Sequence, residues 1–204
     1  MIPNIGNVES FWLNEVTECY KKNNLIYVRI LKNASTFYTN LFINNEWDAI
    51  KFKDIDWERN QVFSFIQDPV VRYCKGITED LYQNEPLKEK IVPVIKDHPV
   101  DTVILTYHTL PISLLCGEHM YKIKWFTLDS DAVSTQQLDS FCKQHHVSLD
   151  WSRDVHWNVS KFEKINFFNN LKFLLGNANH IFWKLFAKDI DLYNYVCNQK
   201  NISN

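Results

Sequence analysis

Lys32, Ser35 and Thr36 form the part of the sequence best suited to hold an anion. They belong to the stretch LKNAST, which follows an apolar, β-branched run at residues 24–31 and leads into a helix-compatible segment at residues 35–43. A strand that enters a helix through small and hydroxyl residues exposes unpaired backbone N–H groups, which attract an anion together with the helix dipole. Lys32 adds a mobile positive charge. The pattern alone leaves two interpretations open, an anion site or a helix simply capped by a hydroxyl.

A second stretch whose residues are suited to ligand binding is QDPVVRYCKGI, which begins at Gln67 and includes Lys75. It follows a short buried run at residues 61–66, and Pro69 suits the first turn of a helix that we expect over residues 69–82. In folds with parallel strands, ligands bind outside the carboxyl ends of the strands. The turns that follow the two apolar runs are both such ends, so we expect both to face a ligand.

Composition excludes several classes of site. The net charge of −2 argues against a general nucleic-acid or membrane-surface binder. The seven histidines show no metal-ligand spacing, so we expect no metal. Five widely spaced cysteines predict reduced thiols.

We see no signal peptide and no apolar stretch of bilayer-spanning length, so the sequence predicts a cytoplasmic protein. The Asn-, Lys- and Ile-rich usage is typical of an A/T-rich viral or bacterial genome.

The elements that must position these residues alternate between strands and helices. The length predicts one domain over residues 1–204. Alternation predicts an α/β fold with a mainly parallel sheet flanked by helices. Further strands are expected at residues 101–107 and 122–128. Helices are expected at residues 8–22, 112–116, 134–145 (capped by Ser134), 161–175 and 178–197.

Several of these stretches together resemble the sulfotransferase family, most closely its carbohydrate sulfotransferase branch. LKNAST is similar to the family's 5′-phosphosulfate loop, and QDPVVRYCKGI to its second nucleotide motif. Three later pieces follow in family order. They are His108-Thr109-Leu110-Pro111, Asn158-Val159-Ser160 and the closing AKDIDLYNYV, at residues 187–196.

The resemblance implies a P-loop-like three-layer sandwich that moves a sulfuryl group from 3′-phosphoadenosine 5′-phosphosulfate to a hydroxyl or amine, without a metal. Lys32 matches the family lysine that stabilises the leaving phosphate. Asn33, Ala34, Ser35 and Thr36 would hold the 5′-phosphate.

The match is weaker at the motif for the 3′-phosphate. The family has Arg and Ser where this sequence has Gln67 and Lys75. Gln keeps hydrogen-bond donors but loses the bidentate charge that suits phosphate. Lys75 restores one positive charge there, or it is an ordinary exposed helix lysine.

The general base that sulfation of a hydroxyl needs is left open. His108 is one candidate, because it follows a predicted strand, and a structural histidine is the alternative. No histidine lies between the two nucleotide motifs. That segment instead contains acidic residues interleaved with Trp47 and Trp57. Two interpretations are open: these residues form a sugar-binding wall, or they form a solvated surface around tryptophans that anchor the core. These acids are Glu46, Asp48, Asp54, Asp56 and Glu58.

Three functions follow for comparison. The first is an active sulfotransferase for a carbohydrate or other small hydroxyl acceptor. The second is a nucleotide-binding or interaction protein of the same fold that has lost catalysis, which the neutral Gln67 keeps open. The third is a small-molecule kinase, disfavoured by the missing phosphate loop and by the lack of a clear magnesium-holding strand aspartate.

Overall fold

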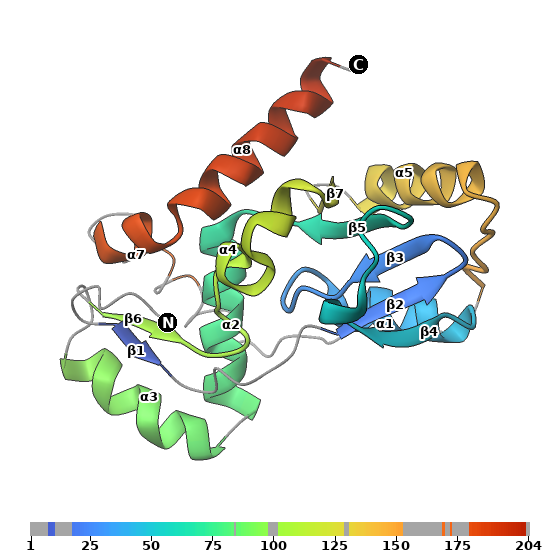
Figure 1. Cartoon of the computed structure of the whole chain (residues 1–204). Coiled ribbons are helices and arrows are strands. Elements are labelled where there is room, and N and C mark those ends of the chain that lie inside the picture. The colour runs from blue at the N-terminus through green and yellow to red at the C-terminus, as the bar shows by residue number, and fades with distance from the viewer. Residues whose placement is uncertain are drawn as a thin grey trace. The chain divides into compact units, whose positions relative to one another are not determined.

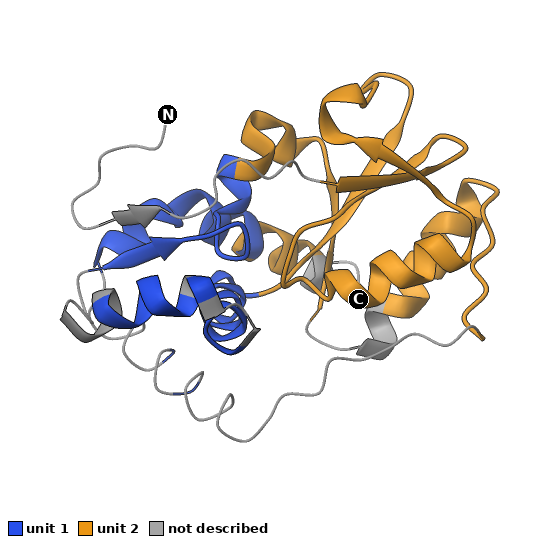
Figure 2. Ribbon diagram, turned by 90° about the horizontal axis from the view of Figure 1, so that it is seen from below, with its two compact units in different colours: residues 1–15, 68–114, 159–193 blue, residues 16–67, 115–158, 194–204 orange. Residues whose placement is uncertain are grey.

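The structure, a computed structural model, describes residues 8–10, 18–83, 85–97, 102–128, 131–152, 169, 172 and 180–202. The chain divides into two compact units, each assembled from segments that are distant in the sequence (Figure 2). Unit 1 comprises Met1–Glu15, Asp68–Leu114 and Val159–Tyr193, and unit 2 comprises Val16–Gln67, Leu115–Asn158 and Asn194–Asn204. The expectation of a single domain over 1–204 therefore stays a prediction.

Unit 2 is built on a five-stranded sheet in the order β4-β2-β3-β5-β7 (Figure 1). Its strands are β2 (Glu18–Lys22), β3 (Leu25–Val28), β4 (Asp48–Lys51), β5 (Gln61–Ile66) and β7 (Lys124–Thr127). Strands β3, β5 and β7 run parallel, whereas β2 is antiparallel to both β3 and β4. The α/β class is confirmed. The sheet is mixed, so the expectation of a mainly parallel sheet holds only for its β3-β5-β7 half.

The helix expected over residues 8–22 is wrong, because β1 (Val8–Ser10) and β2 are strands. Strand β2 pairs with β3 across a two-residue turn, in which Asn23 has φ 56°. Asn tolerates this left-handed conformation, so KKNNL is a hairpin sequence. Cys19 of β2 is fully buried in this pairing. Burial and turn chemistry thus outweigh the apparent helical pattern.

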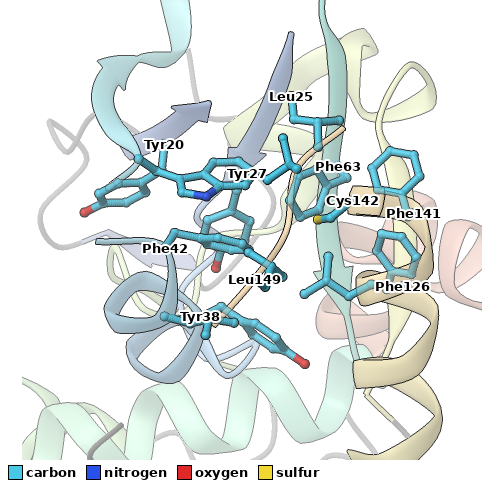
Figure 3. Packing of buried hydrophobic residues seen from close by; sticks show 14 of the residues in the cluster. Tyr20, Leu25, Tyr27, Tyr38, Phe42, Phe63, Phe126, Phe141, Cys142 and Leu149 are labelled. Atoms are coloured by element: carbon cyan, nitrogen blue, oxygen red, sulfur yellow. The ribbon is translucent and has the colours of Figure 1, made fainter. Parts of the chain in front are cut away.

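Two helices pack on the same face of this sheet. They are α1 (Ser35–Asn44) and α5 (Asp131–Gln144). The ring of Phe63 on β5 lies 5.7 Å from that of Phe42 on α1 and 5.5 Å from that of Phe141 on α5 (Figure 3). One side chain that meets both helices places them on one side of the strand. Helix α5 begins before Ser134, so the predicted cap at that residue is wrong.

An aromatic cluster between α1 and the sheet fixes the position of the strand-to-helix turn. Tyr27 of β3 is 1% exposed, and its ring lies 4.7 Å from that of Phe42. Tyr38 stacks on Phe65 of β5. Each such ring buries a large apolar area and prefers a tilted or offset neighbour. The start of α1 is therefore anchored to β3 and β5 by its own side chains (Figure 3).

Unit 1 contains a two-stranded parallel pair and several helices. The strands are β1 and β6 (Val103–Leu105), and the helices are α2 (Pro69–Gln83), α3 (Glu85–Asp97) and α7 (His180–Leu185). Helices α4 (Ile112–Cys116) and α8 (Ala187–Ile202) contribute residues to both units. The predicted helix over 178–197 is divided into α7 and α8, and the one over 161–175 falls largely outside the described residues.

Gly76 allows α2 to lie directly against the turn that follows β6. A Cβ atom at this position would lie 2.6 Å from Cγ2 of Thr109 and 2.7 Å from the carbonyl oxygen of His108. Real Cβ atoms essentially never come so close, and the carbonyl belongs to the backbone, so it cannot rotate away. The glycine is therefore required here for space rather than for an unusual backbone angle.

Substitution of Gly76→Ala is expected to lower the free energy of unfolding by about 1–3 kcal/mol, the usual cost of overpacking. Urea unfolding followed by circular dichroism measures it. Thr109→Ser removes the Cγ2 atom but keeps the hydroxyl, so it should relieve part of the cost in the double variant. A Gly76→Ala variant as stable as the wild type would contradict the close approach.

Candidate functional site

The turn between β3 and α1 has the backbone shape of an anion-binding loop. Lys32 and Ala34 have φ 65° and 52°, in the left-handed region, on either side of Asn33. Alternation of this kind directs successive N–H groups into a common concavity. Within the turn, the N–H of Asn33 donates to the carbonyl oxygen of Ile30, at 3.2 Å. Helix α1 starts from Ala34, and no side chain caps it. The alternative interpretation, a helix capped by Ser35 or Thr36, is therefore not what the structure has.

Two side chains fix this turn to the neighbouring strand. The Nδ2 of Asn33 donates a hydrogen bond to the carbonyl oxygen of Phe65, at 2.6 Å. The Nε2 of Gln67 donates to the carbonyl oxygen of Lys32. Strands β3 and β5 are parallel neighbours, so the turn and Gln67 follow the carboxyl ends of adjacent strands. Both turns therefore follow carboxyl ends of parallel strands, as predicted, and the structure adds that these two strands are neighbours.

Exposure separates the predicted turn residues into two groups. Asn33 and Ser35 are buried, at 1% and 6% exposure, and they belong to the interior of the turn. Lys32 and Ala34 are half-buried, and Thr36 is exposed. Thr36 is thus the most exposed residue of the turn, with the half-buried Lys32 and Ala34 beside it. The Oδ1 of Asn33 is buried and has no hydrogen-bond partner among the described residues.

The remaining predicted site residues belong to unit 1. Lys75 is exposed on α2. His108 lies in the turn after β6, where its Nδ1 contacts the carboxylate of the buried Asp80. The turn residues and Gln67 are therefore grouped by the structure, whereas the contributions of Lys75 and His108 stay predictions.

Unit 1 holds a buried polar cluster that joins three of the resembling motifs. Arg72, from QDPVVRYCKGI, is fully buried and donates through Nη2 to the carbonyl oxygen of Leu110. The same Nη2 lies 3.9 Å from Oδ2 of Asp189, which comes from AKDIDLYNYV. Asp189 also accepts the backbone N–H groups of Ile112 and Ser113, at 2.6 and 3.0 Å. Segments that are far apart in the sequence thus lie together around the Asp189 carboxylate.

The acidic stretch does not form a tryptophan-lined wall. Trp47 is a core residue at 5% exposure, with its ring 4.5 Å from that of Phe42, so it is unavailable to a sugar. Trp57 is half-buried and stacks on His119, with the ring centroids 4.3 Å apart. Asp56 accepts the N–H groups of Glu58 and Arg59, which is a turn-forming role. The other acids named as alternative bases, Glu46, Asp48, Asp54 and Glu58, are exposed.

The buried cysteines are unsuited to nucleophilic chemistry. Burial raises the pKa of Cys19, Cys74 and Cys142 to about 12, because the thiolate would lose its hydration. In the described part of the chain no group of three or more His, Cys, Asp or Glu side chains is arranged to hold a metal ion. Nor does any helix there combine the length and apolar character needed to cross a bilayer.

Comparisons with family models, with curated proteins and with solved structures gave no significant match.

Two buried aspartates that organise these polar clusters carry no signal in the local sequence. Asp80 is a single aspartate within a helix, and nothing in its local sequence marks it as a partner of a residue 28 positions away. Asp189 stands in the closing motif AKDIDLYNYV, yet its role in ordering the start of α4 depends on a contact with a residue 77 positions away. Both roles arise from tertiary contacts, which no local pattern encodes.

Proposed function

We propose that this protein is a sulfotransferase that binds 3′-phosphoadenosine 5′-phosphosulfate at the turn between β3 and α1. The observation that carries the proposal is the uncapped start of α1 beside Lys32 and Ala34, both left-handed, at the carboxyl ends of two parallel strands. Backbone amides and the helix dipole at such a place favour a phosphate. The resemblance of LKNAST to the family loop supplies the identity of the donor.

The chemistry requires stabilisation of charge on the leaving nucleotide. In an in-line displacement, the acceptor oxygen attacks sulfur, and negative charge grows on the oxygen that bridges sulfur and phosphorus. A lysine aimed at that oxygen stabilises the transition state more than the ground state. Lys32, which stands directly before the buried Asn33, fills this role in the proposal. The turn's amides and the Thr36 hydroxyl would hold the 5′-phosphate.

Gln67 supports the turn through its hydrogen bond to the carbonyl oxygen of Lys32. This bond gives a neutral side chain a structural role at the position where the family has arginine. Gln67 is 6% exposed, and an amide donor holds a carbonyl without placing a charge beside Lys32. The 3′-phosphate then needs another cation, and Lys75 is our candidate. Lys75→Ala should weaken binding of adenosine 3′,5′-bisphosphate and leave that of adenosine 5′-phosphate unchanged. Equal affinities of wild type and variant for the bisphosphate, measured by calorimetry, would eliminate Lys75.

A thermal-shift assay tests the proposed function. Adenosine 3′,5′-bisphosphate should raise the melting temperature, because a ligand at a hundredfold excess over its Kd stabilises the fold by about 2.7 kcal/mol. ATP with magnesium should give little or no shift. A shift with ATP and magnesium alone would favour the kinase alternative. No shift with either ligand would contradict nucleotide binding altogether.

A nucleotide-binding protein without catalysis is the second candidate, and the neutral, buried Gln67 at the family's arginine position favours it. Such a protein would also show a higher melting temperature with adenosine 3′,5′-bisphosphate. The two differ in turnover: only the enzyme releases adenosine 3′,5′-bisphosphate from the sulfate donor when a hydroxyl acceptor is present. A panel of sugar acceptors and product detection by chromatography decides between them.

A further inference from the structure

Arg29 and Glu18 form an ion pair at the end of β3 that leads into the turn. Nη1 of Arg29 donates to Oε2 of Glu18, and the backbone N–H of Arg29 donates to the carbonyl oxygen of Glu18, at 2.9 Å. The backbone bond continues the ladder between β2 and β3 by one residue beyond Val28. Side-chain exposure is 28% for Arg29 and 56% for Glu18, so water reaches both charges. The pair and the turn belong to the same compact unit.

The side chain of Arg29 lies on the face of the sheet that α1 covers. Tyr27 faces this helix, since its ring lies 4.7 Å from that of Phe42 (Figure 3). Side chains two residues apart in an extended strand point to the same face, which places Arg29 beside Tyr27. Burial raises the pKa of the Tyr27 hydroxyl, and the positive charge of Arg29 opposes that rise, as expected of neighbouring groups.

This position brings a second positive charge close to the turn. Arg29 precedes Lys32 by three residues, and three fully extended residues span at most about 11 Å. The Debye length is about 10 Å at 0.1 M salt, so the guanidinium adds to the potential that an anion meets at the turn. Helix α1 begins at the same end of β3, where its dipole is positive. The carboxylate of Glu18 opposes both contributions.

From this geometry we propose that Arg29 is a second cation of the phosphate site at the turn, and that Glu18 weakens binding by offsetting its charge. The inference rests on the proposed binding of a nucleotide phosphate at that turn. Gln67 places no charge there, so Lys32 and Arg29 together supply the positive charge that a phosphate needs. Arg29 acts on the ligand through space, and Glu18 determines how much of its charge remains effective.

Opposite substitutions in the pair test the inference, because they separate charge from structure. Arg29→Met and Glu18→Gln both break the ion pair, so a merely structural role predicts weaker binding in both variants. The proposal predicts opposite signs. At low salt, the Kd for adenosine 3′,5′-bisphosphate should rise about two- to fivefold in Arg29→Met and fall about two- to fivefold in Glu18→Gln, as expected for charges about 10 Å apart in water. Isothermal titration calorimetry measures both values.

Control variants and a change of salt complete the experiment. Arg29→Lys keeps the charge and should bind as the wild type does. Arg59→Met and Glu118→Gln remove exposed charges that precede β5 and β7 in the same unit, so they lie at the opposite ends of the strands from the turn. Because six-residue β5 spans about 20 Å, these two variants should change the Kd by less than about 1.5-fold. At about 0.15 M salt the opposite effects of Arg29→Met and Glu18→Gln should shrink.

Each result decides one part of the inference. An unchanged or lower Kd in Arg29→Met would overturn the role of Arg29, and an unchanged or higher Kd in Glu18→Gln would overturn that of Glu18. If Arg29→Met fails to fold by circular dichroism, the exposed Glu18→Gln decides alone by the same criterion.

Failure of the proposed function is distinguishable, because the wild type would then not bind the bisphosphate. Inorganic phosphate replaces the nucleotide in that case, with the amide shifts of Ala34, Ser35 and Thr36 as the readout and the same signs expected in the two variants. A wild-type protein whose turn binds no phosphate either would overturn this inference as well.

Discussion

Substitution of Lys32→Met is expected to lower kcat by about 10²- to 10³-fold, a loss of roughly 3–4 kcal/mol of transition-state stabilisation. Methionine keeps the apolar stem of the side chain and most of its length, so the turn should fold unchanged. In the proposed mechanism, the substitution removes the charge that faces the leaving oxygen. Measurement of bisphosphate release from the sulfate donor at saturating acceptor gives the value directly.

The matched control for Lys32→Met is Lys53→Met, at an exposed lysine of the same unit. It removes the same charge at another position, so general effects of net charge cancel in the comparison. Its kcat should equal that of the wild type. A Lys32→Met enzyme within threefold of the control would rule out the proposed role of Lys32 in the transition state.

Removal of the Asp189 carboxylate is expected to cause a large loss of stability. Asp189→Ala takes away the negative charge that faces the buried Arg72 and the acceptor of the Ile112 and Ser113 amides. Loss of one member of a buried ion pair costs about 3–5 kcal/mol, because the other charge remains in the interior. Urea unfolding monitored by tryptophan fluorescence measures the free energy of unfolding.

Asp191→Ala is the control for this substitution, since Asp191 lies two residues away on the same helix and is exposed. Surface substitutions of this kind usually change stability by no more than about 0.5 kcal/mol. The difference between the two variants therefore isolates the buried contacts from the helix propensity of alanine. Equal stability of the two variants would show that the cluster around Asp189 contributes nothing measurable.

The elements with strong local signals were predictable from the sequence. Strand β5 has the predicted bounds, because QVFSFI is a short apolar run closed by Asp68-Pro69. Helix α1 follows from its inward-facing aromatics, and α2 from Pro69 at its first turn. These signals are sufficient to predict the strand-to-helix turn at residues 29–34, where we propose that an anion binds.

The sequence did not predict which distant strands pair with each other. Strand β6 pairs with β1, about 95 positions away, and lies outside the five-stranded sheet in which a strand at 101–107 would be expected. The same holds for the two bonds that fix the turn, since Asn33 and Gln67 each bond to a backbone carbonyl more than 30 positions away. Local periodicity reports which face is buried, but not against which neighbour.

The central claim, that the turn between β3 and α1 binds the nucleotide, is tested most directly by amide chemical shifts. Adenosine 3′,5′-bisphosphate is titrated into ¹⁵N-labelled protein, and the backbone N–H signals are followed. We predict saturable shifts that are largest at Ala34, Ser35 and Thr36, and that are weakened in Lys32→Met. Saturable shifts confined to other residues, or no shifts at all, would contradict the account.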